Sequence, residues 1–159
     1  MVTGGIEKLD LDLSREDGDF VLVASRWNGD IVEKLIDGAT SMLLAQGVEE
    51  QKIHVFRVPG AFEIPIMCQR VINRGSVVAV LALGVVIRGD TPHFEYVAGG
   101  CTNGIIQVSL QTGIPISNGV LTVDSIEQAL ERSNFGHGNK GAEAAIAALE
   151  MVHLLKEAG

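Results

Sequence analysis

The sequence predicts an α/β fold: a doubly wound, parallel four-stranded sheet with helices on both faces. A run of small and aliphatic residues at 77–86 is typical of a strand that is buried on both faces of a parallel sheet. Strand-like and helix-like segments alternate along the chain from residue 19, which predicts right-handed βαβ units. The length of 159 residues is enough for one domain with a substantial core.

The first half of the chain contains two strand-helix pairs. Asp30 with Glu33 three positions later predicts a capping box at the start of the first helix, and Gly47 is expected to end that helix. A Pro-Gly turn closes the second strand. The expected segments are strands at 19–25 and 52–58 and helices at 30–47 and 64–73.

The second half continues the alternation. Asp124 and Glu127 predict the opening of a short helix. The glycine-rich stretch 136–141 follows that helix, and its simplest interpretation is a flexible connector with Asn139 as the N-cap of the next helix. The expected segments are strands at 77–86 and 114–123 and helices at 94–111, 124–133 and 140–156.

Composition and charge limit the classes of partner and compartment. The net charge is −8 without any basic run, which argues against nucleic acid and membrane surfaces as partners. The two cysteines, Cys68 and Cys101, fall inside expected helices, which favours a reducing compartment. No secretory signal or membrane-spanning run is visible, so a cytoplasmic, soluble protein is expected. Residues 1–18 are expected to be either a flexible arm or a strand that pairs with a neighbour, and residues 19–159 a single domain.

Three loops that follow strands carry candidate site residues. Trp27 lies in the first, Phe62 and Glu63 in the second, and Gly89-Asp90-Thr91 with His93 in the third. The carboxyl ends of parallel strands meet at one edge of the sheet, so these residues are expected to converge. An aromatic ring, a carboxylate and a histidine suit a planar heterocycle. A glycine-containing turn before a helix suits a phosphate.

Each of these residues also has a purely structural interpretation. Trp27 after a strand is often a packing residue, and Glu63 in a first helical turn is favoured there by the helix dipole. The ordinary pKa of histidine, about 6.5, makes His93 a capable proton shuttle, but this holds for any histidine. No histidine pair has the spacing of a zinc site, so no metal is expected. The sequence contains neither a GxxxxGK[ST] loop nor a GxGxxG after the first strand.

Six segments, taken together and in order, resemble the lumazine synthase family of riboflavin biosynthesis. The segments are RWN at 26–28, VPGAFEIP at 58–65, GVVIRGDTPH at 84–93, GVLT at 119–122, IEQALER at 126–132 and GNKG at 138–141. The resemblance implies a flavodoxin-like sheet and a cofactor-free transferase. Its reaction joins 5-amino-6-ribitylamino-pyrimidinedione to 3,4-dihydroxy-2-butanone 4-phosphate and yields 6,7-dimethyl-8-ribityllumazine, phosphate and water.

The resemblance also implies a role for each matched residue. Trp27 would stack on the pyrimidinedione, and backbone groups of Val85, Val86 and Ile87 would bind its polar edge. Gly89, Asp90 and Thr91, together with Arg132, would hold the phosphate. His93 would transfer protons. The ribityl chain is expected at the Ala61 backbone and the Glu63 carboxylate, beside Phe62.

In the family the site lies between subunits, so the resemblance implies a homo-oligomer in which Arg132 and Lys140 act across an interface. Family members are pentamers or shells of twelve pentamers, and the short connector between these two residues favours the shell, for which riboflavin synthase is a candidate partner. Many relatives have an aromatic residue at the position of Asn118. An asparagine there either leaves the ring face open or forms a hydrogen bond.

Two other functions fit parts of this pattern. A lumazine-dismutating riboflavin synthase has no phosphate to bind, so the phosphate residues favour the condensing enzyme. A non-catalytic flavin- or lumazine-binding protein, or a shell-forming paralogue, is expected to lose His93, Arg132 or Lys140, and all three are present.

Overall fold

The computed structural model describes residues 9–11 and 17–159. Most of the expected N-terminal arm lies outside the described residues. The strands are β1 Asp19–Ser25, β2 Ile53–Val58, β3 Val77–Ile87 and β4 Ile116–Val123, and the helices are α1 Gly29–Ala45, α2 Ile64–Asn73, α3 His93–Thr112, α4 Ile126–Ser133 and α5 Lys140–Ala158. Single 3₁₀ turns lie at Glu50–Lys52, Ala61–Glu63 and Phe135–His137.

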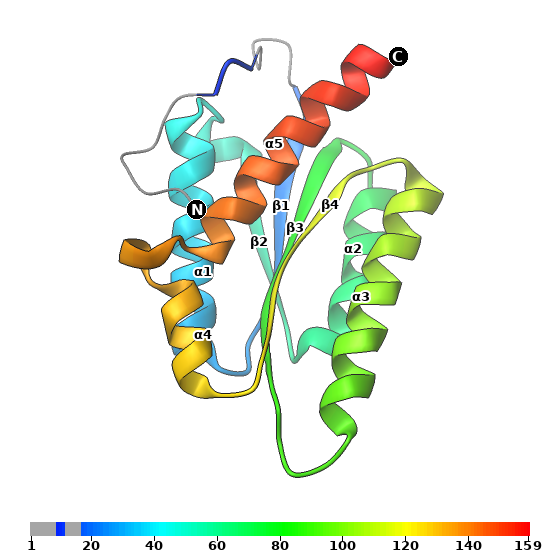
Figure 1. Ribbon diagram of the computed structural model, residues 1–159. Helices are drawn as coiled ribbons and strands as arrows, with labels where there is room; N and C mark the ends of the chain where they lie inside the picture. The colour runs from blue at the N-terminus through cyan, green and yellow to red at the C-terminus, as the bar shows by residue number, and fades with distance from the viewer. Residues whose placement is uncertain (1–8, 12–16) are drawn as a thin grey trace.

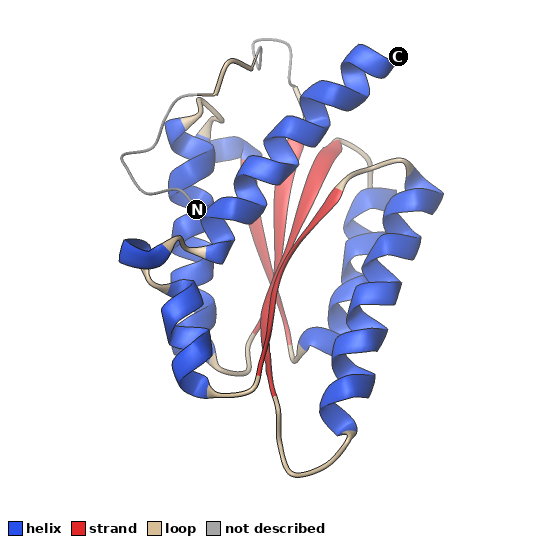
Figure 2. Cartoon of the chain, viewed as in Figure 1, coloured by secondary structure: helices blue, strands red, loops and turns tan. Residues whose placement is uncertain are grey.

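The four strands form one parallel sheet in the order β2-β1-β3-β4. Helices α1, α4 and α5 cover one face of the sheet, and α2 and α3 cover the other (Figures 1 and 2). The predicted doubly wound α/β fold is therefore confirmed. Strands β2 and β4 are the edges, so β1 and β3 have neighbours on both sides.

The core has two layers, one on each face of the sheet. Successive strand residues point to opposite faces. Phe20 and Leu22 of β1 accordingly pack with α1 and α5, whereas Val21 and Val23 pack with α2 and α3. Residues 79–86 of β3 are buried throughout, as expected for a strand covered on both sides. Burial of this aliphatic surface stabilises the sheet at roughly 25 cal/mol per Å² of apolar area.

Three boundaries differ from the sequence prediction. Helix α1 begins at Gly29, because Asn28 adopts a left-handed conformation (φ 59°) and turns the chain directly from strand to helix. The expected capping box at Asp30 does not form, because Asn28 is the N-cap and Asp30 already lies in the first turn of the helix. Ser125 caps α4 through its side chain, and β4 begins at Ile116, two residues later than predicted.

Among the described residues, none of the helices is long and apolar enough to cross a membrane.

Candidate active site

A cavity of about 260 Å³ lies at the carboxyl edge of the sheet, and we call it the carboxyl-edge pocket. It brings together the ends of β1 and β3 and the start of α3. Most of the predicted loop residues line it. They are Trp27, Ala61, Val85, Val86, Ile87, Gly89, Thr91 and His93, joined by Asn28, Phe94 and Val97, which sequence reasoning did not single out.

The indole of Trp27 lies against the Pro-Gly turn and not in the core. A Cβ atom on Gly60 would come 2.5 Å from its Cε3 and Cζ3 atoms, so glycine is required for this approach. Trp27 is nevertheless 63% exposed. Core packing therefore does not account for Trp27, and much of the side chain is accessible from the pocket side or from solvent.

Phe62 and Glu63 lie near the carboxyl-edge pocket but do not line it. Oε2 of Glu63 accepts a hydrogen bond from the N–H of Gly60 at 3.0 Å, which stabilises the turn that precedes α2. The ring of Phe62 packs against Gly100 of α3 and is 62% exposed. Both residues thus have local structural contacts, as the simpler interpretation of Glu63 suggested.

The loop between β3 and α3 carries the remaining predicted groups. His93 is the first residue of α3 and is exposed, and its N–H lies 3.4 Å from Oγ1 of Thr91. Gly89 and Thr91 line the pocket, whereas Asp90 is exposed and does not. The loop leads into the N-terminus of α3, where the helix dipole favours an anion.

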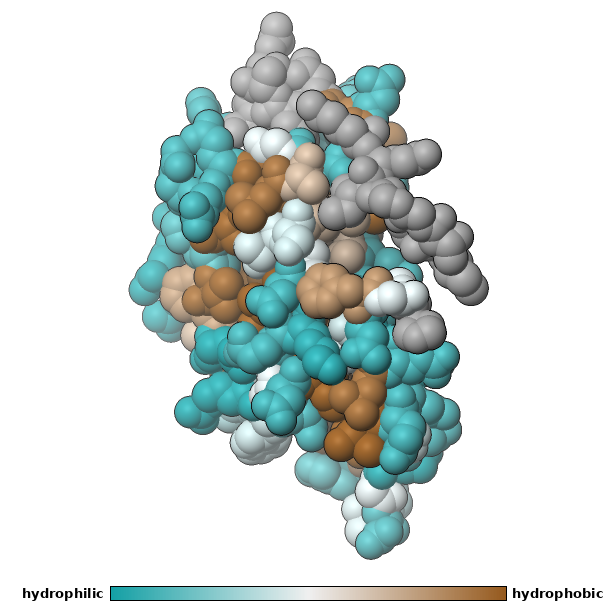
Figure 3. Space-filling view, turned by 90° about the vertical axis from the view of Figure 1, so that its left-hand side faces the viewer, coloured by the Kyte–Doolittle hydropathy of each residue, from teal (hydrophilic) through white to brown (hydrophobic). Residues whose placement is uncertain are grey.

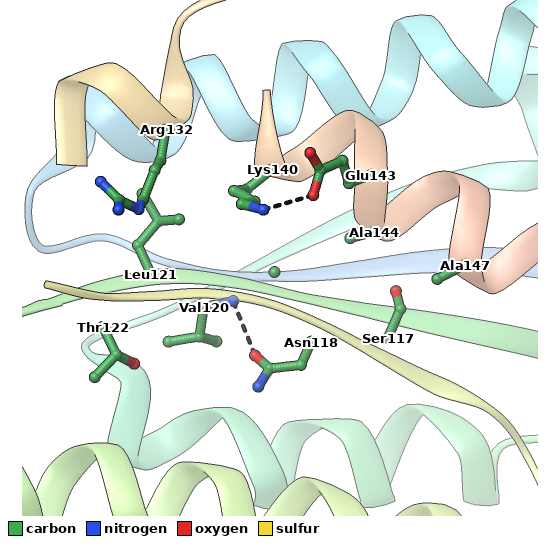
Figure 4. Close-up of a pocket in the computed structure, with 11 residues that line it drawn as sticks. Ser117, Asn118, Val120, Leu121, Thr122, Arg132, Lys140, Glu143, Ala144 and Ala147 are labelled. Atoms are coloured by element: carbon green, nitrogen blue, oxygen red, sulfur yellow. Dashed lines mark hydrogen bonds and ion pairs between the residues drawn. The ribbon is translucent and has the colours of Figure 1, made fainter. Parts of the chain in front are cut away.

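A second cavity, of about 450 Å³, straddles the open edge of β4 (Figure 4), and we call it the edge-strand pocket. It contains the predicted residues Asn118, Arg132 and Lys140. Arg132 and Lys140 approach one face of the strand, and Asn118 points to the other (Figure 4). Oδ1 of Asn118 accepts from the N–H of Val120 at 3.0 Å, a local bond within β4.

Both cations in the edge-strand pocket have partners in the chain. Nζ of Lys140 donates to Oε2 of Glu143 at 2.7 Å, and Nη1 of Arg132 donates to the main-chain oxygen of Gln128 at 3.1 Å. Glu143 was not among the predicted residues, and its i, i+3 spacing from Lys140 was the available signal.

Asn139 holds the two cation-bearing helices together. Its Oδ1 accepts from the N–H of Ala142 at 3.0 Å, which confirms the predicted N-cap of α5. Its Nδ2 donates to the main-chain oxygens of Lys34 (2.9 Å) and Ser133 (2.6 Å). The side chain is buried and links α1, α4 and α5. The connector is therefore anchored at Asn139, next to Lys140.

The charged and nucleophilic groups elsewhere limit the possible chemistry. Burial raises the pKa of Cys68 to about 12 and that of Cys101 to about 11, so both thiols stay protonated at neutral pH. The hydrogen bond that Arg88 donates to the Asp124 carboxylate is the main cause that raises the pKa of Arg88. The part of the chain that the structure describes contains no group of three or more metal-ligating side chains.

The structure thus places most of the predicted site residues in two pockets that share no lining residue, and Phe62, Glu63 and Asp90 line neither of them. His93, Trp27 and the loop after β3 belong to the carboxyl-edge pocket. Arg132, Lys140 and Asn118 belong to the edge-strand pocket. All of the predicted residues can act at one site only if a second copy of the chain contributes to it or if this chain rearranges.

Comparison with known proteins supplies the family. The chain is 52% identical over 142 residues to a 6,7-dimethyl-8-ribityllumazine synthase of Halorhodospira halophila (strain DSM 244 / SL1), which covers 89% of this chain and 91% of that relative. A crystal structure of a GDP-L-fucose synthetase from Naegleria fowleri matches with a TM-score of 0.44 and 13% identity over 95% of this chain and 47% of that one. The sequence model of the 6,7-dimethyl-8-ribityllumazine synthase family matches residues 17–156, and the chain belongs to that family.

Proposed function

We propose that this protein condenses 5-amino-6-ribitylamino-pyrimidinedione with 3,4-dihydroxy-2-butanone 4-phosphate to 6,7-dimethyl-8-ribityllumazine, with release of phosphate and water. The observation that carries this proposal is the carboxyl-edge pocket, in which an exposed indole, the end of β3 and an exposed histidine surround one cavity. Family membership supports the same reaction.

In this proposal the carboxyl-edge pocket binds the planar substrate. Trp27 stacks on the pyrimidinedione, and the backbone of Val85, Val86 and Ile87 binds its polar edge. Burial of β3 on both sides makes these backbone groups a rigid reference for the ring. Ala61 and Glu63, beside Phe62, lie where the ribityl chain would leave the pocket. The Glu63 carboxylate has a second oxygen that is not used in its bond to Gly60.

The chemistry requires few protein groups. The amine of the pyrimidinedione attacks the ketone carbonyl of the butanone, and loss of water gives an imine between the two substrates. Removal of a proton then expels phosphate, and a second substrate amine closes the ring with loss of water. His93 at the pocket wall moves protons in these steps, a contribution of about 10²–10⁴-fold in typical enzymes. Orientation of the two substrates supplies the rest.

The phosphate is held by the loop Gly89-Asp90-Thr91 with Arg132 of a neighbouring copy. In one chain these groups lie in separate pockets, and the edge-strand pocket opens at the unpaired edge of β4. A neighbour placed so that its edge-strand pocket faces this chain's carboxyl-edge pocket would complete the site with Arg132, Lys140 and Asn118.

Exposed apolar side chains support assembly into such an oligomer. Tyr96 and Leu110 of α3 are 75% and 78% exposed, and Ile66 of α2 is 70% exposed. Figure 3 shows further brown, apolar groups between teal, hydrophilic ones on another face. Apolar surface of this kind marks interaction sites. We propose that the chain forms pentamers and that twelve pentamers assemble into a shell, with riboflavin synthase as its candidate partner. A native mass measurement distinguishes a single pentamer from the shell.

A direct assay tests the proposed reaction. Purified protein is mixed with both substrates, and lumazine formation is followed by absorbance and fluorescence against the spontaneous reaction. A rate well above the spontaneous one is expected. A rate equal to it, in assembled protein, would instead indicate a lumazine-binding or shell-forming protein.

A further inference from the structure

Arg88 is the most highly connected exposed side chain next to the carboxyl-edge pocket. Its Nε donates to Oδ1 of Asp124 at 2.8 Å, and its Nη1 lies 3.8 Å from Oε1 of Glu95. Its Cζ lies 4.5 Å from the ring centroid of Phe94, a cation–π contact. Phe94 also lines the pocket. The guanidinium thus meets two carboxylates and an aromatic ring, and arginine suits both kinds of partner because it combines a fork of several N–H donors with a flat face.

These contacts join two loops that the sequence separates by more than thirty residues. Arg88 begins the loop between β3 and α3, and Asp124 lies between β4 and α4. The N–H of Arg88 also donates to the main-chain oxygen of Val123 at 2.9 Å. One residue therefore fastens the start of the β3–α3 loop to the end of β4 by a main-chain bond and a side-chain bond.

The connection continues into the helix that carries Arg132. The N–H of Asp124 donates to Oε1 of Gln128 at 2.8 Å, and the main-chain oxygen of Gln128 accepts from Arg132 at 3.1 Å. Polar contacts thus run without interruption from Arg88 to Arg132.

We infer that Arg88 is a positioning residue that sets the geometry of the phosphate loop Gly89-Asp90-Thr91 and of His93 by tying that loop to the start of α4. This inference rests on the proposed function, because the phosphate belongs to the proposed substrate. The alternative, direct binding of the phosphate by Arg88, is disfavoured because its guanidinium already faces two carboxylates and an aromatic ring.

Charge and shape can be separated by substitution. Arg88→Lys keeps the positive charge but loses the fork that reaches Asp124 while lying over Phe94. Positioning therefore predicts that Arg88→Lys behaves like Arg88→Ala, whereas direct phosphate binding predicts that lysine restores function. Asp124→Ala removes the side-chain acceptor of Arg88 and leaves Arg88 itself unchanged, so it provides an independent variant. Arg70→Ala, in the last turn of α2, is the matched control for loss of an exposed arginine.

The experiment compares these variants in two readouts on assembled protein. The first is lumazine formation with each substrate varied in turn, and the second is calorimetric binding of inorganic phosphate. For Arg88→Ala we expect KM for the butanone phosphate to rise and kcat to fall. Together these changes are expected to lower kcat/KM by about 10- to 100-fold, the scale of a misplaced reacting group. KM for the pyrimidinedione is expected to stay unchanged. Phosphate binding is expected to weaken in parallel, and Arg88→Ala/Asp124→Ala is expected to match the single variants, since the two residues act as a unit.

Several results would overturn the inference. They are wild-type kinetics and phosphate binding in Arg88→Ala, full restoration by Arg88→Lys, and additive losses in the double variant. If Arg88→Ala does not assemble, Asp124→Ala decides on the same criteria. Failure of the proposed function looks different, because wild-type protein would then not accelerate lumazine formation. In that case, phosphate binding that is weaker in both Arg88→Ala and Arg88→Lys supports the positioning role, and unchanged binding in Arg88→Ala rejects it.

Discussion

His93 lies on the wall of the carboxyl-edge pocket and is open to solvent. The substrates supply their own nucleophile, so we expect His93→Ala to lower kcat by less than about 10²-fold, the low end of acid–base contributions. Steady-state kinetics measure the change. His54→Ala is the control, because His54 pairs with Asp19 at the amino ends of β2 and β1, away from the carboxyl-edge pocket. A fall to the spontaneous rate with intact binding and assembly would show that His93 is indispensable.

Asn118 lines the edge-strand pocket, where the proposed shared site would bring it to the substrate of a neighbouring copy. Its side chain bonds to the N–H of Val120 and offers no ring to a substrate. We expect Asn118→Phe to lower KM for the pyrimidinedione by about 2- to 10-fold, the value of one aromatic pair. Asn118→Ala, which removes the bond and adds no ring, is the control. An equal change in both variants would exclude stacking as the cause.

At the scale of elements, the packing of α5 on α1 depends on Gly141. A Cβ atom there would come 1.9 Å from the main-chain oxygen of Leu35. We expect Gly141→Ala to destabilise the fold by about 3 kcal/mol or more, as a backbone clash cannot be relieved by side-chain rotation. Gly136→Ala, with nothing within 4 Å of its Cβ, is expected to change stability by less than about 0.5 kcal/mol. Urea denaturation of both variants measures this, and equal midpoints would refute it.

The buried thiols between α2 and α3 predict a pH dependence. Thiols of the unfolded chain ionise near pH 8.5, whereas burial raises the pKa values of Cys68 and Cys101 to about 12 and about 11. Above about pH 8.5 the native state therefore holds more protons than the unfolded state, and the free energy of unfolding falls as pH rises. Urea midpoints between pH ~7.5 and ~10 measure the slope. The variant Cys68→Ala/Cys101→Ala is expected to show a shallower slope, and an unchanged slope would contradict this origin.

Element types were predictable from the sequence, and element ends were less so. The uninterrupted apolar run identified β3, because a strand covered on both faces needs apolar side chains at every position. The start of α1 was missed because Asn28 leads into the helix by its left-handed backbone conformation, and its side chain forms no capping hydrogen bond. Asn139 was predicted as a cap, but its bonds to Lys34 and Ser133 join segments distant in sequence.

At the scale of the whole molecule, the proposed shared site predicts complementation. Trp27 and Arg132 lie in different pockets of one chain, so Trp27→Ala and Arg132→Ala damage opposite halves of a site. When subunits of the two variants are unfolded and reassembled together in equal amounts, about a quarter of the sites are expected to be restored. Each half of a site then has an even chance of coming from a subunit in which that half is undamaged. Mixing without reassembly is the control. No gain after reassembly would mean that each site is built within one chain.

The sequence by itself determined the parallel α/β architecture and the convergence of three loops, because both follow from local periodicity and from the direction of the strands. It also contained the motifs that the family shares. Only the tertiary structure decided that Arg132, Lys140 and Asn118 lie in a different pocket from His93, and that Arg88 ties the phosphate loop to α4. These contacts depend on how helices and loops far apart in the chain pack in space, and no local pattern encodes that arrangement.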